Sequence, residues 1–152
     1  MIKGLKDGKI MTKLFNTVHE IKLRLLLLMN VLSPTPISCS RLRILDQLTL
    51  YGLDYKITSR NLNGNNKYKL QEYISRHSII QDALNNLVLQ GYAEIIFSES
   101  GFQYKITHAG SKYCDALNDD YKDTYSEESR LVVDKTHNLS DLELEYYITS
   151  NE

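Results

Sequence analysis

The stretch from residue 77 to residue 110 constrains the fold more than any other part of the chain. Apolar residues recur at helical spacing up to Val88, and Gly91 follows at a position where helices commonly end in a left-handed residue. Two short segments of alternating apolar and polar residues come next, separated by the turn residues 98–101. The stretch therefore predicts a helix that leads directly into a two-stranded β-hairpin.

Capping residues and helix breakers predict two helices before this unit. Thr17 opens a capping box ahead of a helix at about 21–32, and a proline-containing connection follows that helix. A second helix begins at Ser38 or Ser40 and ends at Gly52. Both helices are rich in leucine, so both are expected to contribute to the core.

The segments around the hairpin are also predicted to be helical. An apolar stripe over residues 69–90 fits either one long helix or two helices with a break near Ser75 or Ser78. After the hairpin, Thr107 can cap a helix that continues to Leu117. The hairpin is therefore expected to lie between two helical segments.

Together these elements predict a mainly α fold with a small β-hairpin, arranged as a winged helix-turn-helix with a C-terminal helical arm. Winged helices bind DNA, RNA or other proteins, so this architecture does not fix a function. The predicted organisation is a flexible lead-in, a winged-helix domain and an acidic helical C-terminal arm, at residues 1–14, 15–118 and 119–152 respectively.

The near-neutral net charge of −1 hides an asymmetry between the two parts of the chain. Residues 1–118 carry 15 basic and 9 acidic residues, a net charge of +6, whereas residues 119–152 carry 3 basic and 10 acidic residues, a net charge of −7. The acidic arm is either a solvated helix surface, a docking surface for a basic partner, or a shield between the body and nucleic acid.

Tyrosine and aliphatic residues recur at helical spacing within this acidic arm. Tyrosine is favoured where a surface is half-buried against another surface. These residues either pack on the body of the same chain or contact a partner. The candidates for partner binding are Tyr121, Tyr125, Leu131, Val132, Tyr146 and Tyr147.

Sequence-specific DNA binding by this chain alone is disfavoured. The helix that would read DNA carries Glu72 and Asp82, and the turn of the hairpin carries Glu99, where a phosphate-binding surface needs cations. Nonspecific contacts with DNA remain an alternative to an ordinary solubilising role for the basic residues of the body. The candidates for such contacts are Arg41, Arg43, Lys67, Lys69 and Arg76.

The sequence gives little support for catalysis, and we expect no metal and no cofactor. The four histidines lie in separate elements without a zinc-binding spacing. The strongest alternative is a metal-dependent nuclease site formed by Glu94 with Gln103 and Lys105, but it lacks a clear second acidic ligand. Lys105 is more simply explained as an outward-facing residue of a strand.

The expected location is the cytoplasm, without membrane association. Cys39 and Cys114 are far apart in the sequence and are expected to be thiols in a reducing environment. The most apolar run, 25–32, is too short to span a bilayer. The start of the chain is polar and rich in lysine, unlike a signal peptide.

Several motifs, taken in order, resemble one protein family over roughly residues 15–133. These motifs are Phe15-Asn-Thr-x-x-Glu20, Arg41-Leu-x-Ile-Leu-Asp46, Gly52-x-Asp54, the positions Arg76, Ile80, Leu84, Leu89 and Gly91, then Gly101-Phe-x-Tyr104-x-Ile-Thr107, and Tyr121. The pattern is similar to that of the middle component of bacterial ABC-three-component systems, the small subunit of Lamassu-type anti-phage defence. One departure is the segment 61–66, Asn-Leu-Asn-Gly-Asn-Asn, where the family often has a Ser-Leu-His-Pro-like element.

The resemblance implies an accessory subunit without catalytic activity of its own. Its partners would be SMC-like ATPase subunits and an effector, commonly a nuclease, in a hetero-oligomer that meets DNA through the complex. The alternative that the residues leave open is a winged-helix transcription regulator, dimeric through its C-terminal helices.

Overall fold

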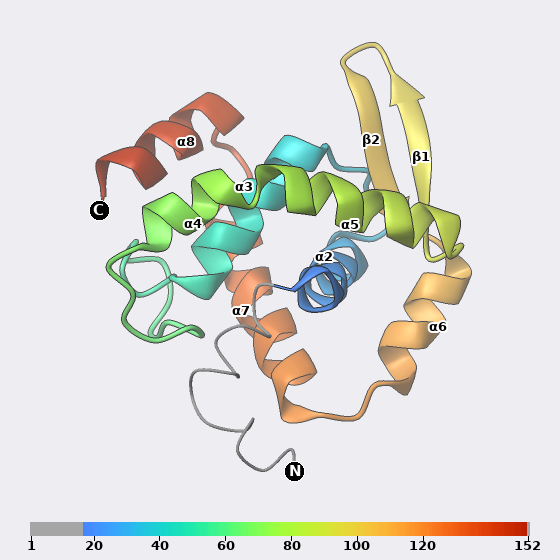
Figure 1. The fold of residues 1–152 in the computed structure, drawn as a ribbon, viewed down its shortest axis with the longest axis horizontal. Coiled ribbons are helices and arrows are strands. Elements are labelled where there is room, and N and C mark those ends of the chain that lie inside the picture. The colour runs from blue at the N-terminus through green and yellow to red at the C-terminus, as the bar shows by residue number, and fades with distance from the viewer. Residues whose placement is uncertain (1–16, 152) are drawn as a thin grey trace.

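The structure is a computed structural model that describes residues 17–151. The predicted lead-in at residues 1–14 lies outside these residues. Seven helices and two strands follow one another along the described chain, and Figure 1 shows their arrangement. They are α2 (Val18–Leu32), α3 (Cys39–Leu50), α4 (Lys69–Ser75), α5 (His77–Leu89), β1 (Ala93–Ser98), β2 (Gly101–Ile106), α6 (His108–Ala116), α7 (Asp120–Thr136) and α8 (Asp141–Ser150).

Side-chain caps determine where most of these helices begin. Thr17, Ser38 and Thr107 each accept a hydrogen bond from a backbone N–H in the first turn of the helix that follows. Ser140 and Glu143 form a complete capping box at the start of α8. The cap predictions at Thr17 and Thr107 are confirmed, and of the two alternatives for α3 it is Ser38 that caps the helix.

Two helix boundaries differ in detail from the sequence prediction. The stripe over residues 69–90 is divided at Arg76 into α4 and α5, so the alternative of a break is the one confirmed. Helix α3 ends at Leu50, before Gly52, because the chain turns away at Tyr51. Gly91 ends α5 with φ +82°, the left-handed conformation expected for it.

The hairpin is a two-stranded antiparallel sheet in which Ala93 pairs with Ile106 and Phe97 with Phe102. Ile37, in the connection between α2 and α3, forms an isolated antiparallel bridge to Tyr104 through two backbone hydrogen bonds of 2.9 and 2.7 Å. The mainly α fold with a small hairpin is therefore confirmed, and the connection before α3 is tied to β2, on the side of that strand away from β1.

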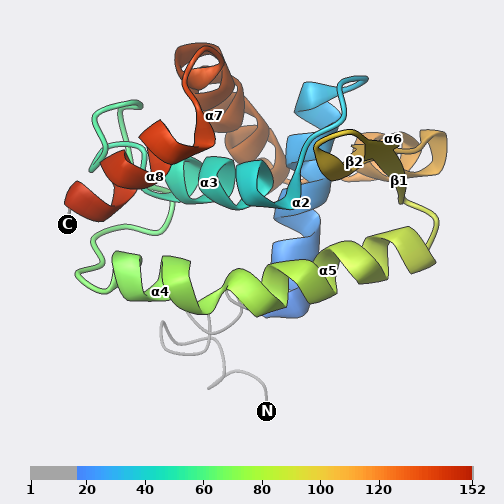
Figure 2. The same cartoon turned by 90° about the horizontal axis from the view of Figure 1, so that it is seen from above.

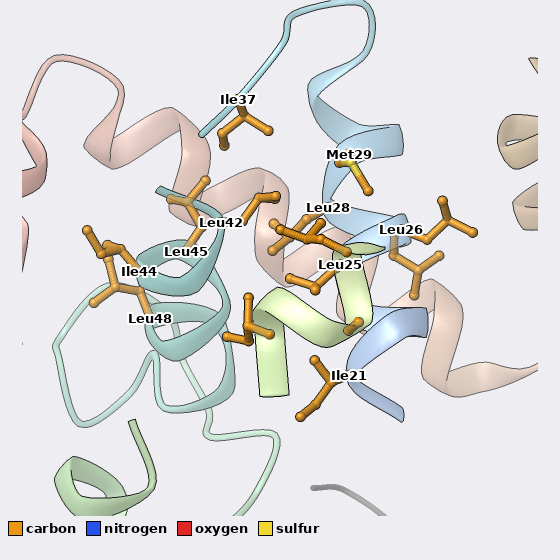
Figure 3. Close-up of a cluster of buried hydrophobic side chains, with 14 of the residues drawn as sticks. Ile21, Leu25, Leu26, Leu28, Met29, Ile37, Leu42, Ile44, Leu45 and Leu48 are labelled. Atoms are coloured by element: carbon orange, nitrogen blue, oxygen red, sulfur yellow. The ribbon is translucent and has the colours of Figure 1, made fainter. Parts of the chain in front are cut away.

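One hydrophobic core runs through both the body and the C-terminal helices. Figure 3 shows its central part, where the leucines of α2, including Leu25 and Leu28, meet Leu42 and Leu45 of α3. The same cluster includes residues from the predicted arm: Tyr125, Val132, Leu144 and Ile148. Burial of this apolar surface is the main favourable contribution to folding.

The predicted arm is helical, as expected, and it packs closely on the body. Helix α7 contacts α2 and α3, and α8 contacts α3. Figure 2 shows α7 on one side of α3 and both α4 and α5 on the other side. Among the described residues, no helix is both long enough and apolar enough to cross a membrane.

Candidate partner-binding surfaces

A buried ion pair joins α2 to α3 at the centre of the molecule. Arg24 donates to both carboxylate oxygens of Asp46, from Nε at 2.8 Å and from Nη2 at 3.1 Å, and both side chains are fully buried. The hydroxyl of Tyr125 on α7 donates to the same carboxylate at 2.6 Å. Asp46 therefore connects three helices, because its carboxylate accepts hydrogen bonds from two of them.

The environment of Asp46 favours the charged carboxylate. Burial alone would raise the pKa of Asp46, but the guanidinium of Arg24, together with Arg76 and the Tyr125 hydroxyl, holds that pKa below its usual value. Burial and the neighbouring Asp46 charge raise the pKa of Tyr125 well above its usual value. The pair is thus an anionic acceptor and a neutral donor at physiological pH.

A second polar cluster joins α3 to α4. The side-chain amide of Gln47 donates to the Tyr55 hydroxyl at 3.0 Å and to the carbonyl of Lys69 at 3.1 Å. Arg76, at the break between α4 and α5, donates to the Gln47 side-chain oxygen. This buried cluster gives the polar side chains of α3 partners within the protein.

Arg41 of α3 holds the start of α8. Arg41 donates to the carbonyls of Thr136 and Leu139 at 2.8 and 2.7 Å and to the carboxylate of Asp141 at 2.9 Å. Its guanidinium therefore joins the end of α7, the connecting turn and the start of α8. A bidentate or branched guanidinium contact of this kind fixes geometry better than a lysine would.

The rest of α8 is held through Glu145, which contacts Tyr73 and Arg43, and through Tyr147. Tyr73 of α4 donates to the carboxylate of Glu145 at 2.6 Å, and Arg43 lies 3.7 Å from the same carboxylate and 4.0 Å from the centre of the Tyr73 ring. Tyr147 donates from its hydroxyl to the carbonyl of Tyr55. These contacts fix the side of α8 that faces the body.

The basic residues predicted to contact DNA are mostly engaged inside the protein. Arg41 and Arg43 bind the C-terminal helices, Arg76 is buried, and Lys69 is paired with Asp54 at 3.5 Å. Lys67 remains exposed. The structure therefore places four of these five cations in intramolecular hydrogen bonds or ion pairs and leaves no basic strip along α4 and α5.

The predicted partner contacts in the arm have different environments. Tyr125 and Val132 are fully buried by the chain itself, so neither has surface with which to contact a partner, and that expectation does not hold for them. Tyr121 and Tyr147 are partly buried. Leu131 and Tyr146 are exposed, and for them partner binding stays a prediction.

The first exposed apolar surface, which we call the α8 stripe, consists of Leu142 and Tyr146 on the outward side of α8 and of Leu139 in the turn before the helix. Leu142 is 81 % exposed and Tyr146 is 74 % exposed. They lie four residues apart and so point in the same direction from the helix. Leu139, in the turn before the cap residue Ser140, is also exposed.

The second exposed apolar surface is the hairpin tip, formed by Phe97 and Phe102. These residues continue the apolar side of the hairpin, whose inner pair Ala93 and Ile106 is buried. Phe97 is 74 % exposed and Phe102 is 59 % exposed, and their rings meet edge to face with centroids 5.0 Å apart. Figure 1 shows the hairpin extending beyond the helices, which explains why this pair is uncovered.

The proposed nuclease residues are only partly brought together. Glu94 and Lys105 are cross-strand partners, whereas Gln103 pairs with Ile96. Within the described residues, no group of three acidic, histidine or cysteine side chains is placed to hold a metal ion.

Sequence reasoning missed the hairpin tip and the buried ion pair. Phe97 and Phe102 fit a strand pattern, but nothing in the neighbouring sequence shows that the helices leave this end of the hairpin uncovered. Asp46 gave a stronger signal, because a carboxylate beside Leu45 and Leu48 on an apolar helix must find a buried partner. Its partner, Arg24, lies 22 residues away, and sequence alone did not identify it.

The structure defines a small, mainly helical protein that exposes apolar side chains at several places, among them the α8 stripe and the hairpin tip. Residues 14–152 match the sequence model of Middle Component 2 of the ABC-three component (ABC-3C) systems. Because this match covers nearly the whole chain, the protein belongs to that family. Neither a search of curated proteins nor a search of solved structures found a match. The name of the family implies that the protein works with the other components of such a system.

Proposed function

We propose that the protein is a non-enzymatic accessory subunit that connects an SMC-like ATPase and a nuclease-type effector in a Lamassu-type anti-phage defence complex in the cytoplasm. Membership of the middle-component family supports a role beside other components. The chain would act as a scaffold: it holds the ATPase and the effector together until foreign DNA is detected by the partners.

The observation that carries this proposal is the presence of two separate exposed apolar surfaces. The α8 stripe and the hairpin tip belong to elements that lie apart from each other, since Figure 2 shows α3 and α2 between α8 and the hairpin. Exposed apolar surface with aromatic anchors is typical of protein–protein contacts. Two such surfaces on one small protein fit a subunit with two partners.

The body is proposed to have a winged helix-turn-helix arrangement. Helices α2, α3 and α5, followed by the hairpin, have the required order, and the bridge from Ile37 to Tyr104 supplies the short third strand that such a sheet often has. The 18 residues between α3 and α4 are longer than the tight turn of a simple helix-turn-helix. The arrangement would serve here as a rigid support for the two surfaces.

The alternative of a DNA-binding regulator has less support. The exposed surface of α5 offers Gln81, Asp82, Asn85 and Asn86, and the hairpin turn carries Glu99. Such a surface releases few counterions on contact with phosphates and adds repulsion at its acids.

Co-expression of the tagged chain with the genes adjacent to its own would test the proposed function. We expect a stable complex that contains a much larger ATPase subunit, visible by native mass measurement, while the isolated chain hydrolyses neither ATP nor DNA. A lone dimer that binds a specific duplex at physiological salt would contradict the proposal. Nuclease activity of the pure chain that is lost in Lys105→Ala would also contradict it.

A further inference from the structure

We propose that α8 is a preformed helical ligand, whose stripe inserts into an apolar groove with a basic rim on another component of the system. This inference rests on the proposed function and adds to it the surface that binds and the chemistry of the partner. The experiment described below also detects a different molecule on this surface, such as a second copy of the chain.

The outward side of α8 has the side-chain spacing of a helix that binds in a groove. Leu142 and Tyr146 lie four positions apart within the helix, an i, i+4 spacing that anchors in helix-in-groove recognition also use. Leu142 and Tyr146 are far more exposed than the residues of α8 that contact the body, Leu144 and Ile148, which are buried. The helix therefore has a side for its own protein and a side for another molecule.

Contacts with the body fix the helix before a partner arrives. The capping box of Ser140 and Glu143 begins the helix, and Tyr73 and Arg41 bind Glu145 and Asp141. A ligand that is already ordered loses little conformational entropy on binding. The exposed stripe is thus presented at a fixed angle to the body.

The charge around the stripe indicates the chemistry of the partner. Acidic residues lie beside it at Asp141, Glu143 and Glu145, and α8 contains no basic residue. Both Asp141 and Glu145 keep much of their surface exposed despite their contacts with arginines. Arg41 and Arg43 balance part of this charge, but together with Glu143 the surface stays acidic. A groove lined by apolar residues and bordered by Lys or Arg would be complementary to it, whereas DNA and anionic membranes would not.

The test compares full-length variants co-expressed with the adjacent components. The double variant Leu142→Ala with Tyr146→Ala should weaken capture of one component at least about 30-fold, because central aliphatic and aromatic anchors dominate helix-in-groove affinity. The matched control Leu89→Ala removes an exposed leucine from α5 and should leave capture unchanged. Thermal unfolding of the double variant should match the wild type, since both side chains are exposed.

The basic rim is tested at Thr149, which is exposed near the end of α8. Thr149→Lys should weaken binding and Thr149→Glu should strengthen it, each severalfold and less so at high salt. The helix dipole favours a cation at the C-terminal end of α8, so it would stabilise the helix in Thr149→Lys more than in Thr149→Glu. If helix stability controlled binding, Thr149→Lys would therefore bind more tightly than Thr149→Glu.

Each outcome separates the inference from the proposed function. Normal capture by the double variant would overturn the role of α8 and leave the proposed function standing. A wild-type chain that captures no component would overturn both. A wild-type dimer that the double variant dissociates would identify a second copy as the occupant and so overturn the assignment to another component.

Discussion

Asp46 is the residue on which the packing of three helices depends. Its carboxylate is fully buried and accepts hydrogen bonds from Arg24 on α2 and from Tyr125 on α7. A buried carboxylate is tolerated because an opposite charge and a hydroxyl satisfy its oxygens. Loss of the ion pair and loss of the Tyr125 hydroxyl should have different costs. The first leaves a buried charge without its counter-charge, whereas the second removes only a neutral hydrogen-bond donor.

Asp46→Ala should lower the free energy of unfolding by about 3–5 kcal/mol, because it leaves the Arg24 guanidinium buried without its counter-charge. Tyr125→Phe is the matched control, since it deletes a single hydroxyl, and its expected cost is about 1.5–3 kcal/mol. Urea unfolding followed by circular dichroism measures both. Equal losses from the two variants would show that the charge pair is not the dominant interaction.

The same carboxylate predicts how stability depends on pH. The pKa of Asp46 is lower in the folded protein than in the unfolded chain, so its contribution is fully present above the unfolded pKa of about 3.9. That contribution is lost as the pH falls through the lower, folded pKa. Stability should therefore decline below about pH 4.

The acid decline is checked by urea midpoints between about pH 6 and pH 2.5, for the wild type and for Asp46→Asn. Asp46→Asn cannot titrate at position 46. Its free energy of unfolding should therefore be lower than that of the wild type near neutral pH and should fall less on acidification. Parallel pH profiles of the two proteins would assign the acid sensitivity to other carboxylates.

At the scale of elements, α8 is attached to the body mainly through polar contacts. Arg41 joins Thr136, Leu139 and Asp141, while only two apolar residues of α8 are buried. A short helix with so few buried contacts is expected to open before the core does. Arg41 is therefore predicted to control the order of α8 more than the stability of the whole protein.

Arg41→Ala should increase amide hydrogen exchange in residues 141–150 at least about fivefold while the amides of α2 keep their protection, because three charge-assisted contacts are lost at one end of α8. Arg130→Ala, an exposed arginine on the neighbouring α7, is the control and should change neither segment. Exchange that rises equally in α2 and α8 would show that α8 unfolds only with the core.

Elements with a local chemical cause could be predicted from the sequence. Gly91 ends α5 because the chain needs a left-handed residue there, and Thr107 and Ser140 begin helices because their side chains cap backbone N–H groups. These features depend on a few neighbouring residues. For that reason the mainly helical fold with one hairpin followed from the pattern alone.

The candidate surfaces could be predicted only in part, because exposure depends on distant segments. Tyr146 was expected at a partner surface and is exposed, but Tyr125 belongs to the same pattern and is buried against Asp46. Arg41 and Arg43 look like free cations in the sequence, although acids about 100 residues later neutralise them. Helical periodicity does not show which side a distant helix will cover.

At the scale of the whole molecule, the two exposed surfaces and the single core favour a rigid connector. The C-terminal helices share the hydrophobic cluster of the body, so the α8 stripe and the hairpin tip are held on one framework. Figure 1 shows them at separate places on that framework. A rigid connector allows two partners to bind at once in a fixed geometry, which is the central claim of the proposed function.

The measurement that tests this claim most directly is a bridging experiment with the ATPase and the effector encoded beside this chain. A tagged ATPase is purified with the effector in the presence of the wild-type chain, without the chain, and with a variant of the hairpin tip, Phe97→Ser with Phe102→Ser. We predict that the effector is recovered only with the wild-type chain, and that the hairpin-tip variant remains bound to one partner and loses the other. Equal recovery of the effector without the chain would contradict the account.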